Sequence, residues 1–131
     1  MFNTKLNLIA VLISLVFLLA CSNSSGPERI EANIYFHSFS QAYDSVAQKY
    51  NSAWITVVIE NTGNTDIVYF EYLTIGVDEN NIEYSRKIVD NDVEDFGDEP
   101  LHAGNFNIII SSLNTNGQKI VEAYIDSTSY Y

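Results

Sequence analysis

Hydrophobic and polar residues alternate with a period of two along most of the chain beyond Ile30. This alternation is typical of β-strands that bury one face and expose the other. Short stretches rich in Asn, Asp and Gly separate the alternating segments and favour turns. The pattern predicts strands over residues 32–39, 53–61, 66–79, 82–89, 105–113 and 118–125.

The strand predicted over residues 66–79 differs from the others because its first half is apolar on both faces. A strand that is buried on both sides belongs in the middle of a sheet. Six strands joined by turns, with no helices between them, indicate an all-β protein built as an antiparallel β-sandwich. We expect this sandwich to occupy residues 30–126 and to be followed by a frayed tail over residues 127–131.

Residues 40–50 depart from the period of two. Apolar residues recur there at helical spacing from Ala42 to Tyr50, and Ser40 is suited to cap the start of a helix. The segment is therefore either one short helix that crosses an end of the sandwich or a strand with a ragged edge.

The first twenty residues have the composition of a targeting segment. Lys5 supplies a positive charge, and residues 8–20 form an apolar run that only Ser14 interrupts. The run is too short to span a bilayer as a helix, but it suits a signal peptide. It ends in Leu-Leu-Ala-Cys at residues 18–21, which resembles the lipobox of bacterial lipoproteins.

The lipoprotein resemblance implies cleavage before Cys21 and a diacylglyceryl group on its thiol. It therefore implies a signal peptide over residues 1–20, lipidation at Cys21 and a flexible tether over residues 21–29. Ser22 stands where an Asp tends to retain family members in the inner membrane, so we expect an outer-membrane lipid anchor that faces the periplasm or the exterior. The alternative is an ordinary secretory signal that is cleaved near the same point.

Residues 53–113 combine an Asn-rich turn after one strand, an Asp at the end of a long strand and a Leu-x-x-Gly turn before a Phe-bearing strand. The residues that carry this pattern are Asn61, Gly63, Asp78, Leu101, Gly104 and Phe106. The combination resembles bacterial immunoglobulin-like modules of the FxLYD type. Because those modules are mostly lipid-anchored or secreted and have no known catalysis, the resemblance implies an immunoglobulin-like β-sandwich without an active site.

Acidic residues outnumber basic ones by 17 to 6, which gives a formal net charge of −11. Such a surface repels phosphate backbones, so we expect no nucleic acid partner.

Residues 90–99 concentrate the acidic side chains and form a candidate calcium site, the one cofactor that the sequence suggests. Calcium takes six to eight oxygen ligands, often from alternate carboxylates in a loop. The loop is not an EF-hand, because Asp95 stands where a Gly is needed and Leu101 where a Glu is needed. It is either a looser calcium site or a solvated loop that protects a strand edge. The candidate ligands are Asp90, Asp92, Glu94, Asp95 and Asp98.

Tyrosine is abundant, with nine in the chain. Exposed tyrosines would form an aromatic patch for protein or glycan recognition, whereas inward-facing ones would pack in the core and across strands. The candidate patch residues are Tyr35, Tyr72, Tyr84 and Tyr124.

We find no nucleophile motif and no phosphate-binding loop in the sequence, and the only thiol is expected to carry lipid. The sequence therefore predicts a lipid-anchored envelope lipoprotein that is not an enzyme. It would act as a binding or assembly module with a protein partner in the cell envelope. The alternatives are a calcium-stabilised adhesion or glycan-binding module, and a small hydrolase that uses a pair of carboxylates.

Overall fold

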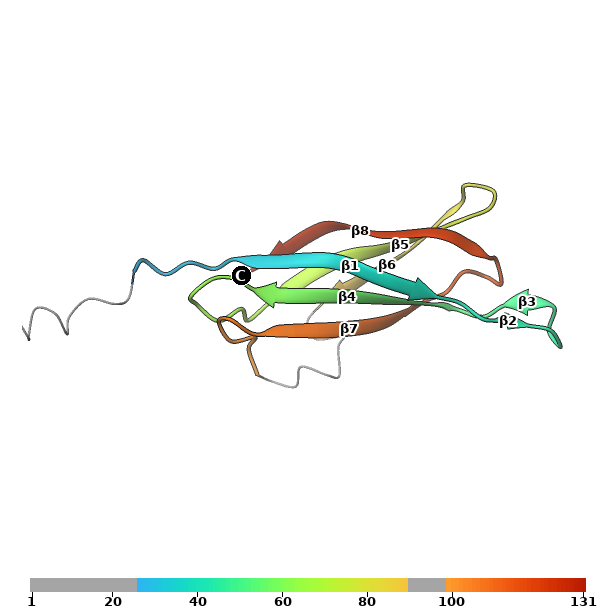
Figure 1. The fold of residues 1–131 in the computed structure, drawn as a ribbon. Coiled ribbons are helices and arrows are strands. Elements are labelled where there is room, and N and C mark those ends of the chain that lie inside the picture. Colours follow the sequence, from blue (N-terminus) through green and yellow to red (C-terminus); the bar gives the residue numbers. More distant parts are fainter. Residues whose placement is uncertain (1–25, 90–98) are drawn as a thin grey trace, which may run out of the picture.

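The chain folds into two antiparallel β-sheets that pack face to face (Figure 1). The structure is a computed structural model that describes residues 26–89 and 99–131. Within these residues there is no helix, so the expectation of an all-β antiparallel sandwich is confirmed. The strands in chain order are β1 (Ala32–Ser40), β2 (Tyr43–Asp44), β3 (Lys49–Tyr50), β4 (Ala53–Asn61), β5 (Phe70–Asp78), β6 (Glu83–Val89), β7 (Phe106–Leu113) and β8 (Ile120–Tyr130).

Three strands form each main sheet. One sheet has the order β1-β4-β7 and the other has the order β6-β5-β8, so β4 and β5 are the central strands. The central position of β5 agrees with the apolar residues on both faces of residues 66–79. The strand was predicted to start at residue 66, but β5 begins at Phe70. Ile67 instead forms an isolated bridge with Leu101, outside the sheet.

The core lies between the two sheets. Its side chains come from the inward-facing positions of the central strands and of their neighbours, and the rings of Phe70 and Tyr72 stack at 6.3 Å between centroids. Burial of each large apolar side chain contributes about 1.5–3 kcal/mol to folding. The buried core residues are Ala53, Ile55, Val57, Ile59, Ile67, Phe70, Tyr72, Ile88, Leu101, Ile109, Leu113 and Ile120.

Residues 40–50 form a hairpin, and the prediction of a short helix there is wrong. β2 and β3 pair with Tyr43 opposite Tyr50, and the two rings meet edge to face at 5.0 Å. The Asp44 carboxylate accepts the backbone N–H groups of Val46 at 2.9 Å and of the next residue at 3.0 Å, which closes the turn. The Val46 side chain is 94 % exposed, so the apolar positions that favoured a helix are not buried.

Gln41 connects this hairpin to the sandwich. Its Nε2 donates to the carbonyl oxygens of Asn51 at 2.8 Å and Gln118 at 2.9 Å, and lies 3.0 Å from the Thr115 hydroxyl. Its Oε1 accepts the backbone N–H of Ile120 at 2.8 Å. One side chain therefore joins the base of the hairpin to the turn between β7 and β8.

The C-terminal residues are paired, so the prediction of a frayed tail over residues 127–131 is wrong. β8 continues to Tyr130, and Tyr131 exchanges backbone hydrogen bonds of 3.0 Å with Tyr69. The rings of Tyr69 and Tyr131 also stack at 4.5 Å. Backbone pairing therefore holds the chain end in the sheet, although most of its side chains remain exposed.

The N-terminal segment is attached to the turn after β4. Asn64 Oδ1 accepts the backbone N–H of Arg29 at 2.7 Å, and Asn64 Nδ2 donates to the carbonyl of Pro27 at 3.2 Å. Gly63 allows this close approach, because a Cβ there would lie 2.2 Å from the Arg29 carbonyl oxygen. The flexible tether that was predicted over residues 21–29 therefore does not extend to Arg29.

Cys21 and the predicted signal peptide over residues 1–20 lie outside the described residues. In the part of the chain that the structure describes, no helix is long and apolar enough to cross a membrane.

Candidate protein-binding surface

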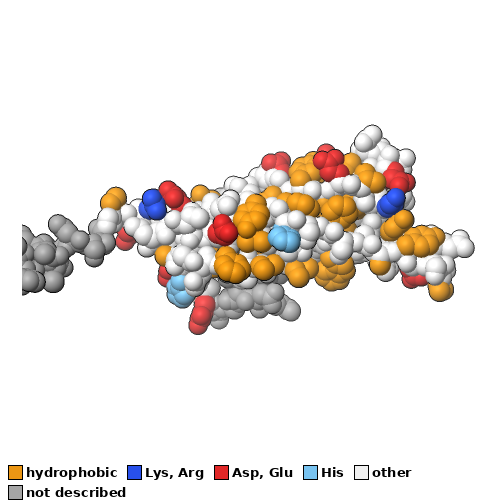
Figure 2. Space-filling view, viewed as in Figure 1, with side chains coloured by type: hydrophobic (Ala, Val, Ile, Leu, Met, Phe, Trp, Pro, Cys, Tyr) orange, Lys and Arg blue, Asp and Glu red, His pale blue; other side chains and the backbone are white. Residues whose placement is uncertain are grey.

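The outer face of the β1-β4-β7 sheet carries large apolar side chains where a solvated sheet face normally carries polar ones. The strand register places Val58 of β4 between Tyr35 of β1 and Ile108 of β7, and places Ile110 beside Thr56. In Figure 2 hydrophobic side chains gather over these three strands. We call this surface the apolar face; its residues are Tyr35, Trp54, Val58, Phe106, Ile108 and Ile110.

Four of these side chains are about half exposed or more. The exposed fractions are 65 % for Phe106, 60 % for Ile110, 52 % for Trp54 and 47 % for Ile108. They lie on neighbouring strands, so their exposed areas adjoin. Adjoining exposed apolar side chains of this kind are typical of interaction sites, which makes the apolar face a candidate binding surface.

The outer face of the β6-β5-β8 sheet differs, because charged side chains lie around its apolar residues. Lys87 Nζ lies 2.7 Å from Glu71 Oε2, and this ion pair is the main cause that lowers the pKa of Glu71. The Tyr124 hydroxyl donates to Glu83 Oε1 at 3.2 Å, across the central strand. This face therefore carries charged side chains around an apolar centre, because β5 contributes Leu73, Ile75 and Val77 to it and Ile75 is largely buried. Its charged side chains are Glu71, Glu83, Lys87, Glu122 and Asp126.

Glu60 is the one acidic residue among the strand residues on the outer side of β1, β4 and β7. Its carboxylate accepts the Tyr35 hydroxyl at 3.3 Å and Asn33 Nδ2 at 3.3 Å. Burial, followed by the nearby Glu60 charge, raises the pKa of Tyr35. The charge is thus held at one end of the apolar face, in the same row as Phe106.

The four tyrosines proposed as a binding patch do not lie together. Tyr35 is on the apolar face, and Tyr124 is on the outer face of the other sheet. Tyr72 is 1 % exposed and belongs to the core, where its hydroxyl has no hydrogen-bond partner among the described residues. Tyr84 is half-buried, and its hydroxyl donates to Asp78 Oδ2 at 3.2 Å. The tyrosine patch is therefore wrong as a single site, and of the four tyrosines only Tyr35 belongs to the apolar face.

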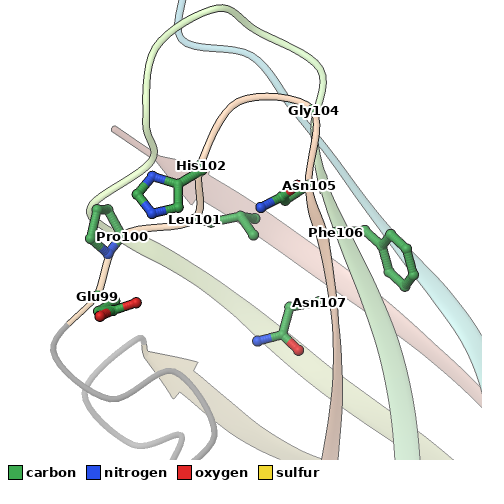
Figure 3. A pocket seen from close by; sticks show the side chains of 8 residues that line it. All are labelled: Glu99, Pro100, Leu101, His102, Gly104, Asn105, Phe106 and Asn107. Carbon is green, nitrogen blue, oxygen red and sulfur yellow. The ribbon is translucent and has the colours of Figure 1, made fainter.

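An open hollow of about 370 Å³ lies at the start of β7 (Figure 3). Beside it His102 Nδ1 is 2.9 Å from Asp66 Oδ2, and this hydrogen bond is the main cause that lowers the pKa of Asp66. Figure 3 shows the Phe106 ring turned away from Pro100 and His102, on the other side of the strand. The lining residues are Glu99, Pro100, Leu101, His102, Gly104, Asn105, Phe106 and Asn107, a set that contains no nucleophilic side chain paired with a base.

Among residues 26–89 and 99–131, no cluster of three or more His, Cys, Asp or Glu side chains is arranged to hold a metal ion. The candidate calcium ligands lie outside these residues, and the calcium hypothesis therefore stays a prediction. Those ligands are Asp90, Asp92, Glu94, Asp95 and Asp98.

Comparison with known proteins adds no relative to this picture: no family model, no curated protein and no solved structure matches the chain.

Proposed function

We propose that this protein is a lipid-anchored lipoprotein of the cell envelope that acts as a non-enzymatic binding or assembly module. Its partner is a protein that docks on the apolar face. The observation that carries the proposal is that the apolar face leaves large side chains exposed on β4 and β7, whereas charged side chains surround the apolar residues on the other outer face.

The composition of the apolar face supports a protein partner. Trp and Tyr are enriched among the residues that dominate binding energy in protein interfaces, and here Trp54 and Tyr35 flank a row of aliphatic side chains. Docking would remove apolar area from water, worth about 25 cal/mol per Å² before the costs of association. The net charge of −11 would steer a basic partner toward the domain.

The lipid anchor is the second part of the proposal, and it is supported by the lipobox-like end of the apolar run at Cys21. Two or three acyl chains on one cysteine meet the requirement for stable attachment to a membrane. The domain would then be presented at the outer membrane, facing the periplasm or the exterior.

We further propose that the sandwich is immunoglobulin-like. The strand order β1-β4-β7 against β6-β5-β8 supports this assignment, as does a chain that changes sheet between β4 and β5, between β6 and β7 and between β7 and β8. In such sandwiches binding surfaces form on sheet faces and loops, which agrees with a site on the outer face of one sheet.

Site-specific photo-cross-linking in the native cell tests the docking surface. A photo-reactive benzoylphenylalanine is placed at Trp54, which is 52 % exposed on the apolar face. The matched control carries it at Val121, which is 51 % exposed on β8. We expect one protein to be captured at Trp54 and not at Val121. Equal capture at both positions, or none at either, contradicts the proposal.

The anchor is tested with Cys21→Ser in the same cells. We expect this variant to leave the membrane fraction and to lose the partner that is captured at Trp54. Retention of the Cys21→Ser variant in the membrane fraction would overturn the lipid anchor while leaving the docking surface intact.

A further inference from the structure

Among residues 26–89 and 99–131, β7 is an edge strand that lacks the charges, proline and bulge that often protect an edge from pairing. It contains no charged residue and no proline, and its register with β4 is continuous from Phe106 to Leu113. The other sheet edges are protected: β6 is charged, β8 carries acidic side chains and a register shift, and β1 has a register shift between Phe36 and Ser38. Exposed, regular and uncharged edges favour pairing with another strand.

The backbone groups on the free side of β7 can be assigned from the register. Asn61 N–H donates to the Asn105 carbonyl at 2.9 Å, so the odd-numbered residues of β7 direct their backbone groups toward β4. The even-numbered residues therefore direct theirs away from the sheet. Those residues are Phe106, Ile108, Ile110 and Ser112.

Two of the outward groups already have partners within the chain. The Ile108 N–H donates to Asn107 Oδ1 at 2.8 Å, and the Ser112 carbonyl accepts from Arg86 Nη1 at 3.0 Å. In the centre of the strand, four groups have no partner in the described part of the chain. They are the Ile110 N–H and C=O, the Ile108 C=O and the Ser112 N–H.

The four free groups of one copy are complementary to the same four groups of a second copy. We propose that two copies of this chain pair antiparallel through β7, with Ile110 opposite Ile110 of the second copy. In this register the two Ile110 residues exchange both of their hydrogen bonds, and each Ile108 C=O accepts a Ser112 N–H from the other copy. Each of these four groups thus meets a complementary group of the second copy.

The two occupied groups fit the same register. The Ile108 N–H of one copy would face the Ser112 C=O of the other, and both groups already have hydrogen-bond partners of their own. If Ile108 lay opposite Ile108 of the second copy, its N–H would have to donate across the contact, but that N–H already donates to Asn107 Oδ1. The pattern of free and occupied groups therefore selects pairing about Ile110.

The charge distribution also fits a second copy. Each chain has a net charge of −11, so two copies repel each other except where charges are absent. β7 is such a place, and pairing there would join the two β1-β4-β7 sheets into one six-stranded sheet. Added salt screens the repulsion, so pairing should become stronger as the salt concentration rises.

Sedimentation equilibrium of the purified full-length protein tests the pairing. Ile110→Lys places two like charges opposite each other at the centre of the contact, and we expect it to weaken the dimer by about tenfold or more. Val121→Lys adds the same charge at an exposed position outside the contact and should leave the dimer unchanged. Equal association of both variants, or a parent protein that stays monomeric up to about 1 mM, overturns the proposal.

A disulfide tests the register in the full-length Cys21→Ser background, which has no other thiol. Opposed residues of a hydrogen-bonded antiparallel pair lie about 5.5 Å apart at Cα, within disulfide range. We expect Ile110→Cys to form a covalent dimer under mild oxidation. Ile108→Cys should not, because its two copies lie four residues out of register. Cross-linking of both variants, or of neither, overturns the register.

Pairing through β7 goes beyond the proposed docking function, and the two can be disproved independently. A monomeric protein that still captures a partner through Trp54 would keep the docking surface and remove the β7 pairing. A dimer that is disrupted by Ile110→Lys, with no partner captured at Trp54, would do the reverse.

Discussion

Arg86 and Ser112 link the two sheets at the open side of the sandwich. The Arg86 guanidinium on β6 donates to the Ser112 carbonyl on β7 at 3.0 Å and lies 3.4 Å from the Ser112 hydroxyl. This contact occupies a carbonyl that a second copy of β7 would otherwise use. Asn107 acts in the same way on the Ile108 N–H. Both side chains therefore limit the number of hydrogen bonds that β7 offers to another strand.

Release of both groups should strengthen the proposed pairing. In the double variant Arg86→Met/Asn107→Ala, the Ile108 N–H and the Ser112 C=O become free, and the symmetric contact gains two hydrogen bonds. At about 1 kcal/mol each, these bonds should lower the dissociation constant of the dimer by about tenfold or more. Sedimentation equilibrium measures the change, with Lys87→Met on the charged face as the control. An unchanged dissociation constant in the double variant would contradict the register.

The Tyr72 hydroxyl offers a test of the core. Burial raises the pKa of this hydroxyl, and the group has no hydrogen-bond partner among the described residues. Tyr72→Phe removes a buried polar group without loss of a hydrogen bond. We therefore expect the variant to be as stable as the parent or up to about 1 kcal/mol more stable in urea unfolding. Tyr84→Phe, which loses the bond to Asp78, should be less stable and serves as the contrast.

Asp78 should make the stability of the domain depend on pH in the acid range. Its carboxylate accepts the backbone N–H of Ile82 at 2.9 Å and of Asn80 at 2.8 Å. The first of these bonds is the main cause that lowers the pKa of Asp78. A lowered folded-state pKa gives stability that is present above about pH 4, the range of an unfolded Asp, and is lost as the pH falls through the folded-state value.

Asp78→Asn should therefore reduce the loss of stability between about pH 4 and pH 2. Urea unfolding at several pH values measures the slope, and Glu79→Gln at the exposed neighbouring position is the control. If the parent and the Asp78→Asn variant show the same slope, the carboxylate does not act as its contacts indicate.

Gln41 should be important for stability although it lies outside the core. Gln41→Ala leaves the Ile120 N–H and the Asn51 carbonyl without their side-chain partner. We expect a loss of about 2 kcal/mol in the free energy of unfolding. Gln118→Ala is the control, because Gln118 takes part in this network only through its backbone carbonyl. Equal losses in both variants would show that the connection contributes little.

The strands were predictable because most of them bury one face and so alternate in sequence. The hairpin over residues 40–50 was not, because a helical apolar pattern stabilises a helix only where tertiary packing covers it, and Val46 is left in water. The pairing of Tyr131 with Tyr69 was also missed, since contacts between residues so distant in sequence leave no local pattern.

The apolar face could not be predicted from the sequence, because β7 carries apolar residues on both of its sides. Its outward positions include Phe106, Ile108 and Ile110, while the inward position 111 is a buried Ser. Alternation shows which residues share a face, but it does not show which face is inside when both are apolar. The run of three isoleucines at 108–110 was therefore assigned to a strand correctly, with no indication that two of them face solvent.

The attachment of Arg29 to the turn at Asn64 places the start of the domain at one end of its long axis (Figure 1). In two copies that pair antiparallel through β7, the N-terminal segments therefore lie at opposite ends of the dimer. If both Cys21 residues carry lipid in a single bilayer, a two-fold axis along the membrane normal places the two N-terminal segments at the same height above the membrane. That axis is perpendicular to the shared sheet, so in this arrangement the sheet lies parallel to the bilayer. The assembled protein would be a flat platform on the membrane, with both apolar faces turned to the same side.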